Sequence, residues 1–149
     1  MGLGHISKQV LTENINCLDK LKDIFCCSEV LRATGGGRSE KLKSFLTSYK
    51  PIFVFLYEVE YGYGSSEELL NKDERIPYQS FAQIFHGWKH KRNTVFSDLA
   101  DNWKNILQTI KYLDHNDPNC GISTIKDEVE SLTSSVELIS GKKVAWPIK

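Results

Sequence analysis

The sequence lacks a long apolar run and lacks an excess of charge of either sign. Its longest apolar stretch, Ile52–Tyr57, is far shorter than the roughly 20 residues that a bilayer-spanning helix needs. No continuously apolar segment follows Met1, so no secretory signal peptide is expected. Nineteen basic and nineteen acidic side chains cancel, which leaves local clusters as the only electrostatic binding surfaces. These absences predict a cytoplasmic protein that contacts no membrane.

Cysteine is scarce, and its positions match no metal-ligand spacing. Two of the four cysteines, Cys26 and Cys27, are adjacent in a segment with helical periodicity, where neighbouring side chains point apart. We therefore expect free thiols in a reducing compartment in preference to a disulfide framework. The other two are Cys17 and Cys120.

Strand alternation is almost absent, and apolar residues recur instead at three- and four-residue steps. The pattern predicts an all-α fold: a compact bundle of five to seven helices in a single domain, 1–149. Gly35–Gly37 is expected to form the loop that ends the first helix. A phosphate-binding loop needs a four-residue gap between glycines, then Lys followed by Ser or Thr, and a strand before it, and neither condition is met here. The helices are predicted at about 6–33, 40–49, 51–60, 65–70, 78–92, 95–115 and 123–140, with a tail at 141–149.

The stretch Ile52–Tyr57 is ambiguous, because β-branched and aromatic residues in an unbroken run are also typical of a buried strand. A single strand would have no pairing partner in this sequence. We therefore predict a helix that starts at Pro51 and forms a central post for the others.

The last helix has the clearest periodicity, which forms a narrow apolar seam. Two interpretations of the seam remain open: it packs on another helix of the same chain, or it joins two chains as a homodimer through 123–140. The short turn before the helix favours the first. The seam residues are Ile122, Ile125, Val129, Leu132, Val136 and Ile139.

The segment 61–92 reads as a helix-turn-helix-like unit. Ser65 or Ser66 is expected to cap its first helix, and acidic residues follow in the first turn, as the helix dipole favours. Residues 71–75 are too polar for a core and form the turn. Pro77 then precedes the second helix, at a position where its missing N–H costs little.

The second helix of this unit has two distinct faces. Tyr78, Phe81, Phe85 and Trp88 share the face that we expect to pack inward. The opposite face carries amides and imidazoles, and the helix ends in cations, which suits duplex DNA because glutamine pairs with adenine edges and cations neutralise phosphates. The residues are Gln79, Gln83, His86 and His90, with Lys89, Lys91 and Arg92 at the end, and a second cluster, Arg38, Lys41, Lys43 and Lys50, is a candidate for flanking phosphates.

GYGSSEELL followed by IPYQSFAQIFHGWKHKR resembles a pattern of the small DNA-binding accessory proteins of conjugative and mobilisable plasmids, the relaxosome or transfer-regulatory proteins. The resemblance covers roughly thirty residues and implies a helix-turn-helix that belongs to a mobile genetic element. It implies base contacts by Gln79, Ser80, Gln83 and His86. It implies phosphate contacts by Lys89, Lys91 and Arg92.

Other chemistries have weaker signals. His86 and His90 have a metal-chelating spacing but no acidic third ligand nearby, and Cys120 near His115 is a thiol beside a base without any other mark of a catalytic site. We therefore expect no catalytic residues, no metal and no cofactor. The alternative to DNA binding is a helical protein-protein interaction module, a subunit, adaptor or inhibitor of a larger complex, in which the outer face of the helix is simply solvated.

Overall fold

The computed structural model describes residues 6–34, 36–91, 96 and 98–144, with the backbone alone at 34, 36–39, 72 and 91. These residues form six α-helices and no strand, which confirms the all-α bundle. The helices are α1 (Lys8–Cys27), α2 (Glu29–Thr34), α3 (Gly36–Tyr61), α4 (Tyr78–Lys91), α5 (Asp98–Asn116) and α6 (Lys126–Ser140), with single 3-10 turns η2 (Glu67–Leu69), η3 (Lys72–Glu74) and η5 (Ile122–Thr124).

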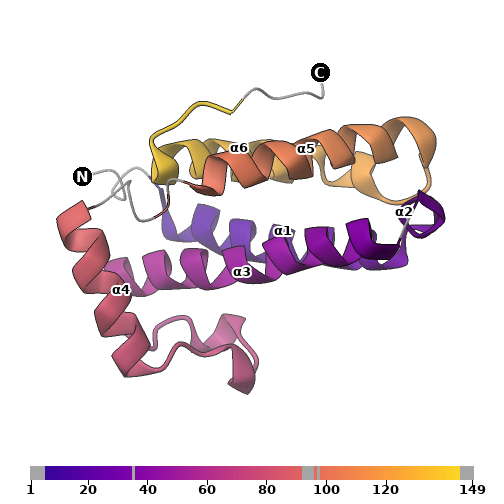
Figure 1. The fold of residues 1–149 in the computed structure, drawn as a ribbon. Helices are drawn as coiled ribbons and strands as arrows, with labels where there is room; N and C mark the ends of the chain where they lie inside the picture. Colours follow the sequence, from indigo (N-terminus) through magenta and orange to yellow (C-terminus); the bar gives the residue numbers. More distant parts are fainter. Residues whose placement is uncertain (1–5, 35, 92–95, 97, 145–149) are drawn as a thin grey trace.

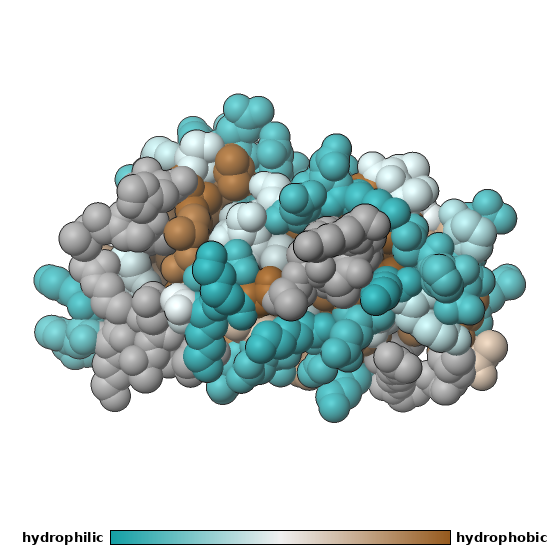
Figure 2. Space-filling model, turned by 90° about the horizontal axis from the view of Figure 1, so that it is seen from above, coloured by the Kyte–Doolittle hydropathy of each residue, from teal (hydrophilic) through white to brown (hydrophobic). Residues whose placement is uncertain are grey.

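Four long helices build the bundle. α1 packs against α3 and α6, and α5 packs against α6 and α3, so that the α5–α6 pair lies over the α1–α3 pair (Figure 1). α4 stands outside this arrangement and crosses one end of the bundle, beside the 62–77 segment. Seen from the α5–α6 side, hydrophilic residues dominate the described surface, as amphipathic helices with one buried face require (Figure 2).

The predicted helix over 6–33 is divided in two at Ser28. Ser7 caps α1, since its Oγ accepts a hydrogen bond from the Val10 N–H at 3.2 Å. Ser28 has extended backbone angles, and its buried Oγ accepts from the Leu31 N–H at 3.3 Å. A serine that offers its hydroxyl to the following backbone favours a cap over a helix interior, so α2 starts anew.

The predicted break at Pro51 is wrong, because α3 runs through it. Proline removes a single amide donor, that to the Thr47 carbonyl, at a cost of about 3 kcal/mol. Leu46, Tyr49 and Phe53, on both sides of the proline, are all buried in the core, and their packing offsets that cost. The prediction of a loop over the glycines is also wrong at Gly36 and Gly37, because α3 begins at Gly36.

The helical prediction for 52–57 is confirmed. The five side chains from Phe53 to Tyr57 are at most 4% exposed. A helix that is apolar on all sides must be covered on all sides, so this part of α3 is the central post of the fold.

The first helix predicted for the helix-turn-helix-like unit is absent: 65–70 holds only the single 3-10 turn Glu67–Leu69. Ser66 does not cap that turn; it is fully buried, and its Oγ donates to Glu58 Oε2 at 2.6 Å. Gly62 and Gly64 have positive φ angles of 104° and 85°, which L side chains rarely adopt. The chain here is a turned loop that precedes α4.

The seam of the last helix packs within the chain, as the favoured interpretation predicted. All six seam residues are at most 6% exposed, so the seam offers no surface for a second copy. α6 begins at Lys126, because the residues before it form η5, and it ends at Gly141 with φ of 74°. α5 begins at Asp98, and the expected start at 95 lies outside the described residues, as does Trp146 of the tail.

All four cysteines are free thiols, as predicted. Among the described residues, none of the helices has the length and apolarity needed to cross a bilayer.

Candidate nucleic-acid interface on α4

α4 is held to the bundle by aromatic contacts with Phe55 of α3. The Phe55 ring centroid lies 5.3 Å from that of Phe81 and 6.1 Å from that of Trp88. Phe85 stacks on Phe81 with centroids 6.1 Å apart. These three residues of α4 are half-buried and face inward, as predicted.

Tyr78 does not join this inward face. It is 65% exposed, and its ring meets the edge of the Tyr63 ring at 5.3 Å. Tyr78 is the first residue of α4, and its contact is with the loop residue Tyr63 instead of with Phe55 of α3.

The outer stripe of α4 is open to solvent, as the helical periodicity predicted. Within the described residues, no side chain of the stripe makes a hydrogen bond or an ion pair. The only ring contact within the stripe joins His86 and His90, whose centroids are 4.5 Å apart. The stripe is therefore free to contact a ligand. Its exposed members are Gln79, Gln83, His86 and His90, with Lys89 beside them.

Among the predicted contact residues that the structure describes, Ser80 stands apart from this stripe. Ser80 is exposed, but with Ile84 it lines a pocket on the side of α4 that faces α3. The side chain of Lys91, like the whole of Arg92, lies outside the described residues.

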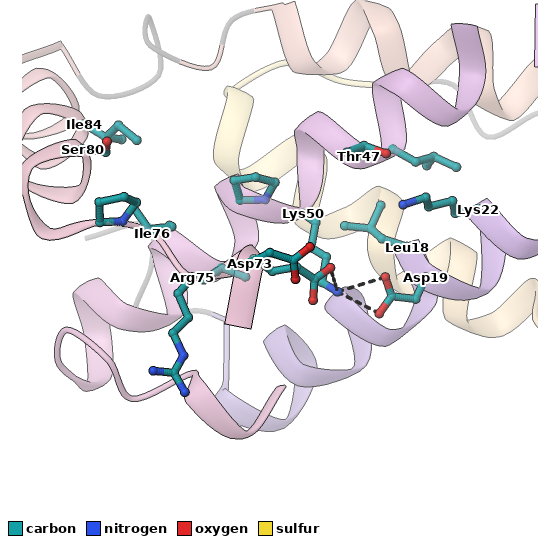
Figure 3. Close-up of a pocket in the computed structure, with 15 residues that line it drawn as sticks. Leu18, Asp19, Lys22, Thr47, Lys50, Asp73, Arg75, Ile76, Ser80 and Ile84 are labelled. Carbon is teal, nitrogen blue, oxygen red and sulfur yellow. Dashed lines mark hydrogen bonds and ion pairs between the residues drawn. The ribbon is translucent and has the colours of Figure 1, made fainter. Parts of the chain in front are cut away.

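The expected second cation cluster is largely engaged. Lys50 Nζ lies 3.1 Å from both carboxylate oxygens of Asp19 and 2.8 Å from Glu74 Oε2 (Figure 3). Lys43 Nζ lies 3.6 Å from Glu40. Lys41 is exposed and places its ammonium 5.9 Å from the Phe45 ring centroid, while the side chain of Arg38 is not described. Lys50 is thus unavailable to phosphates.

The charges of this triad stabilise one another. Burial disfavours the Lys50 ammonium, but hydrogen bonds from it to Glu74 and Asp19 outweigh that effect and raise the pKa of Lys50. The hydrogen bond from Lys50, followed by that from the Asn71 N–H, lowers the pKa of Glu74. Lys50 and Glu74 are therefore both charged at neutral pH.

Lys50→Met is expected to destabilise the fold by about 1–3 kcal/mol at neutral pH, between the values for exposed and buried pairs. Because the pKa of Glu74 is lowered in the folded state, the ionised carboxylate contributes its full stability at pH values above the unfolded-state pKa of about 4.3. That contribution is lost as the pH falls through the lowered pKa of the folded state. The loss measured by urea unfolding should therefore shrink in acid. Lys104→Met, which changes an exposed lysine, should cost less than about 0.5 kcal/mol at either pH; an equal loss in both variants would contradict a special role for Lys50.

The triad closes one side of a pocket of about 510 Å³ between α1, α3, the 71–77 segment and α4 (Figure 3). The mixed lining includes Thr47, whose carbonyl receives no amide bond from Pro51. Sequence reasoning missed this pocket, because Lys50 is 31 residues from Asp19 and 24 residues from Glu74 along the chain.

Neither alternative chemistry gains a complete site. No group of three or more metal-binding side chains in the described ranges is placed to hold a metal ion around His86 and His90 or elsewhere. Burial raises the pKa of the Cys120 thiol, and burial raises that of Cys17 to about 12. Both shifts oppose the thiolate that a nucleophile requires.

Comparisons with protein-family models, with curated proteins and with solved structures found no match for this chain.

Proposed function

We propose that this protein is a non-enzymatic DNA-binding accessory or regulatory protein that contacts duplex DNA through the outer face of α4. The observation that supports this is the exposed and unengaged stripe of two amides and two imidazoles with Lys89 beside it. Amides and imidazoles of this kind reach base edges in a major groove, where a single helix fits. The assignment to a mobile genetic element rests on the sequence resemblance alone.

The bundle supplies a base for this helix. Because Phe81 and Trp88 are anchored on Phe55, the opposite face of α4 is presented in a defined orientation. That orientation is what a protein needs to place side chains against successive bases.

Phosphate contacts are expected at one end of α4 only. Lys89, Lys91 and Arg92 are at its C-terminal end, whereas the exposed acids Glu68 and Asp73 precede its N-terminal end and repel phosphates. Because Lys50 is ion-paired with Asp19 and Glu74, we count three phosphate contacts, so the affinity for DNA should be modest at physiological salt.

Three contacts predict a slope of log K against log salt of about −2.7 for a duplex in a gel-shift or fluorescence-anisotropy titration. Changing Lys89, Lys91 and Arg92 together to Ala should reduce that slope by about one unit per lost contact. The matched control changes the exposed Lys104, Lys111 and Lys142 to Ala, which removes the same charge from other surfaces. An equal loss in both triple variants, or no binding of the wild type to any duplex at low salt, would exclude this surface as a DNA interface.

A second candidate function, a protein-protein interaction module, is supported by exposed aromatic residues at the same end of the molecule. Tyr61, Tyr63 and Tyr78 are 41%, 47% and 65% exposed, and tyrosine is enriched where proteins bind proteins. Under this alternative the wild type binds no duplex at low salt, and the partner docks on the tyrosines next to α4.

A further inference from the structure

A second, smaller cavity lies between the end of α3 and the loop that leads to α4. Its volume is about 270 Å³, just below the range of about 300–1,000 Å³ that is typical of small-molecule sites. Its lining combines acids, one cation, one aromatic ring and two aliphatic side chains. The residues are Glu58, Tyr63, Gly64, Glu67, Leu70, Arg75 and Ile76.

Glu58 has a buried carboxylate oxygen to which no described residue donates. The residue is only 4% exposed. Its Oε2 accepts the hydroxyl of Ser66 at 2.6 Å, but no described group donates to its Oε1. A buried oxygen without a donor is costly and rare in folded proteins, so this atom requires an explanation.

Two polar side chains of the lining already have partners other than Glu58. The Tyr63 hydroxyl donates to the Ile76 carbonyl at 2.6 Å, and the Arg75 guanidinium pairs with Glu67. By formal charge, the two acids and one cation of the lining leave the cavity with one uncompensated negative charge. A single cationic donor is the group that would balance both the charge and the hydrogen bonding.

We propose that this cavity binds a small primary alkylammonium ion, with its N–H groups on Glu58 and its carbon chain against Leu70, Ile76 and the Tyr63 ring. A guanidinium suits the site less well, because it prefers two free carboxylate oxygens and Ser66 already occupies one. A divalent metal suits it less well too, since such ions need several oxygen ligands and no cluster of three or more candidate side chains exists among the described residues. An aromatic ring and aliphatic walls match an ammonium on an alkyl stem.

The test is an NMR titration of the ¹⁵N-labelled full chain with n-butylammonium chloride, with n-butanol as the neutral analogue. We expect saturable shifts of amides between positions 58 and 76 with the ammonium and none with the alcohol. Glu58→Gln keeps the shape of the side chain and removes its charge, so it should weaken binding by about thirtyfold or more. Glu60→Gln, an exposed neighbour on α3, should leave binding unchanged.

The outcomes are distinguishable. A capped lysine carries the same ammonium and stem on a peptide backbone. Tighter binding of the capped lysine than of butylammonium would indicate that the occupant is the lysine side chain of a protein, and weaker binding would indicate a free amine. Equal shifts with butanol, no saturation in the wild type, or equal binding by Glu58→Gln would overturn the proposal. If Glu58→Gln fails to fold, the comparison of butylammonium with butanol on the wild type still decides it.

Discussion

Val129→Glu is expected to unfold the chain. Val129 is fully buried in the middle of the α6 seam. Its backbone carbonyl accepts the Thr133 hydroxyl, which in turn accepts the indole N–H of the fully buried Trp103 at 2.8 Å. A carboxylate placed here has no partner, and the expected loss exceeds about 4 kcal/mol, a large part of a typical stability of about 5–15 kcal/mol.

The measurement is circular dichroism with thermal melting, together with light scattering. Leu138→Glu is the matched control, because it makes the same kind of change on the same helix at a side chain that is 47% exposed; it should alter stability by less than about 0.5 kcal/mol. If Val129→Glu instead gave a folded monomer from a dimeric wild type, the seam would join two chains and the packing of α6 would be wrong.

Phe55→Ala should both destabilise the protein and release α4 selectively. The Phe55 side chain is fully buried, and its ring meets those of Phe81, Trp88 and Phe96 at centroid distances of 5.3, 6.1 and 6.4 Å. Truncation of a buried phenylalanine costs about 3–5 kcal/mol. Because this side chain contacts two residues of α4, hydrogen exchange of the α4 amides should accelerate more than that of α1 or α6.

Phe53→Ala separates the two effects. Phe53 is equally buried on the same helix, so its truncation should lower the free energy of unfolding, measured with urea, by a similar amount. The exchange of the α4 amides should then accelerate no more than that of the bundle amides. Equal exchange patterns in the two variants would contradict the anchoring role of Phe55. If α4 binds DNA, Phe55→Ala should also weaken that binding without altering any residue of the outer stripe.

Periodicity was enough to predict much of this structure. The six seam residues from Ile122 to Ile139 are buried, and Gln79, Gln83, His86 and His90 are exposed on one face of α4. Both results depend on the 3.6-residue repeat, which relates residues three or four apart and needs no knowledge of distant segments. The helical state of 52–57 followed from the lack of any other strand to pair with it.

The predictions that failed did so because tertiary contacts outweighed local preferences. Pro51 is a breaker by local rules, yet packing on both sides carries α3 through it. Ser66 is a natural cap by local rules, yet Glu58 takes its hydroxyl, and the expected helix shortens to a single turn. In both cases a tertiary interaction worth a few kcal/mol outweighs a local preference of about 1–3 kcal/mol.

The amino-acid order by itself determined that this chain is helical and which side of each long helix is apolar, because these properties arise from neighbours within one or two turns. Only the tertiary structure decided that Lys50 is ion-paired with Asp19 and Glu74 and that α4 crosses the bundle end on Phe55. It also decided that Glu58 lines a cavity and that one of its buried oxygens has no donor among the described groups. Those features join residues that only folding brings together, and charge and hydrogen bonding act through space and not along the chain.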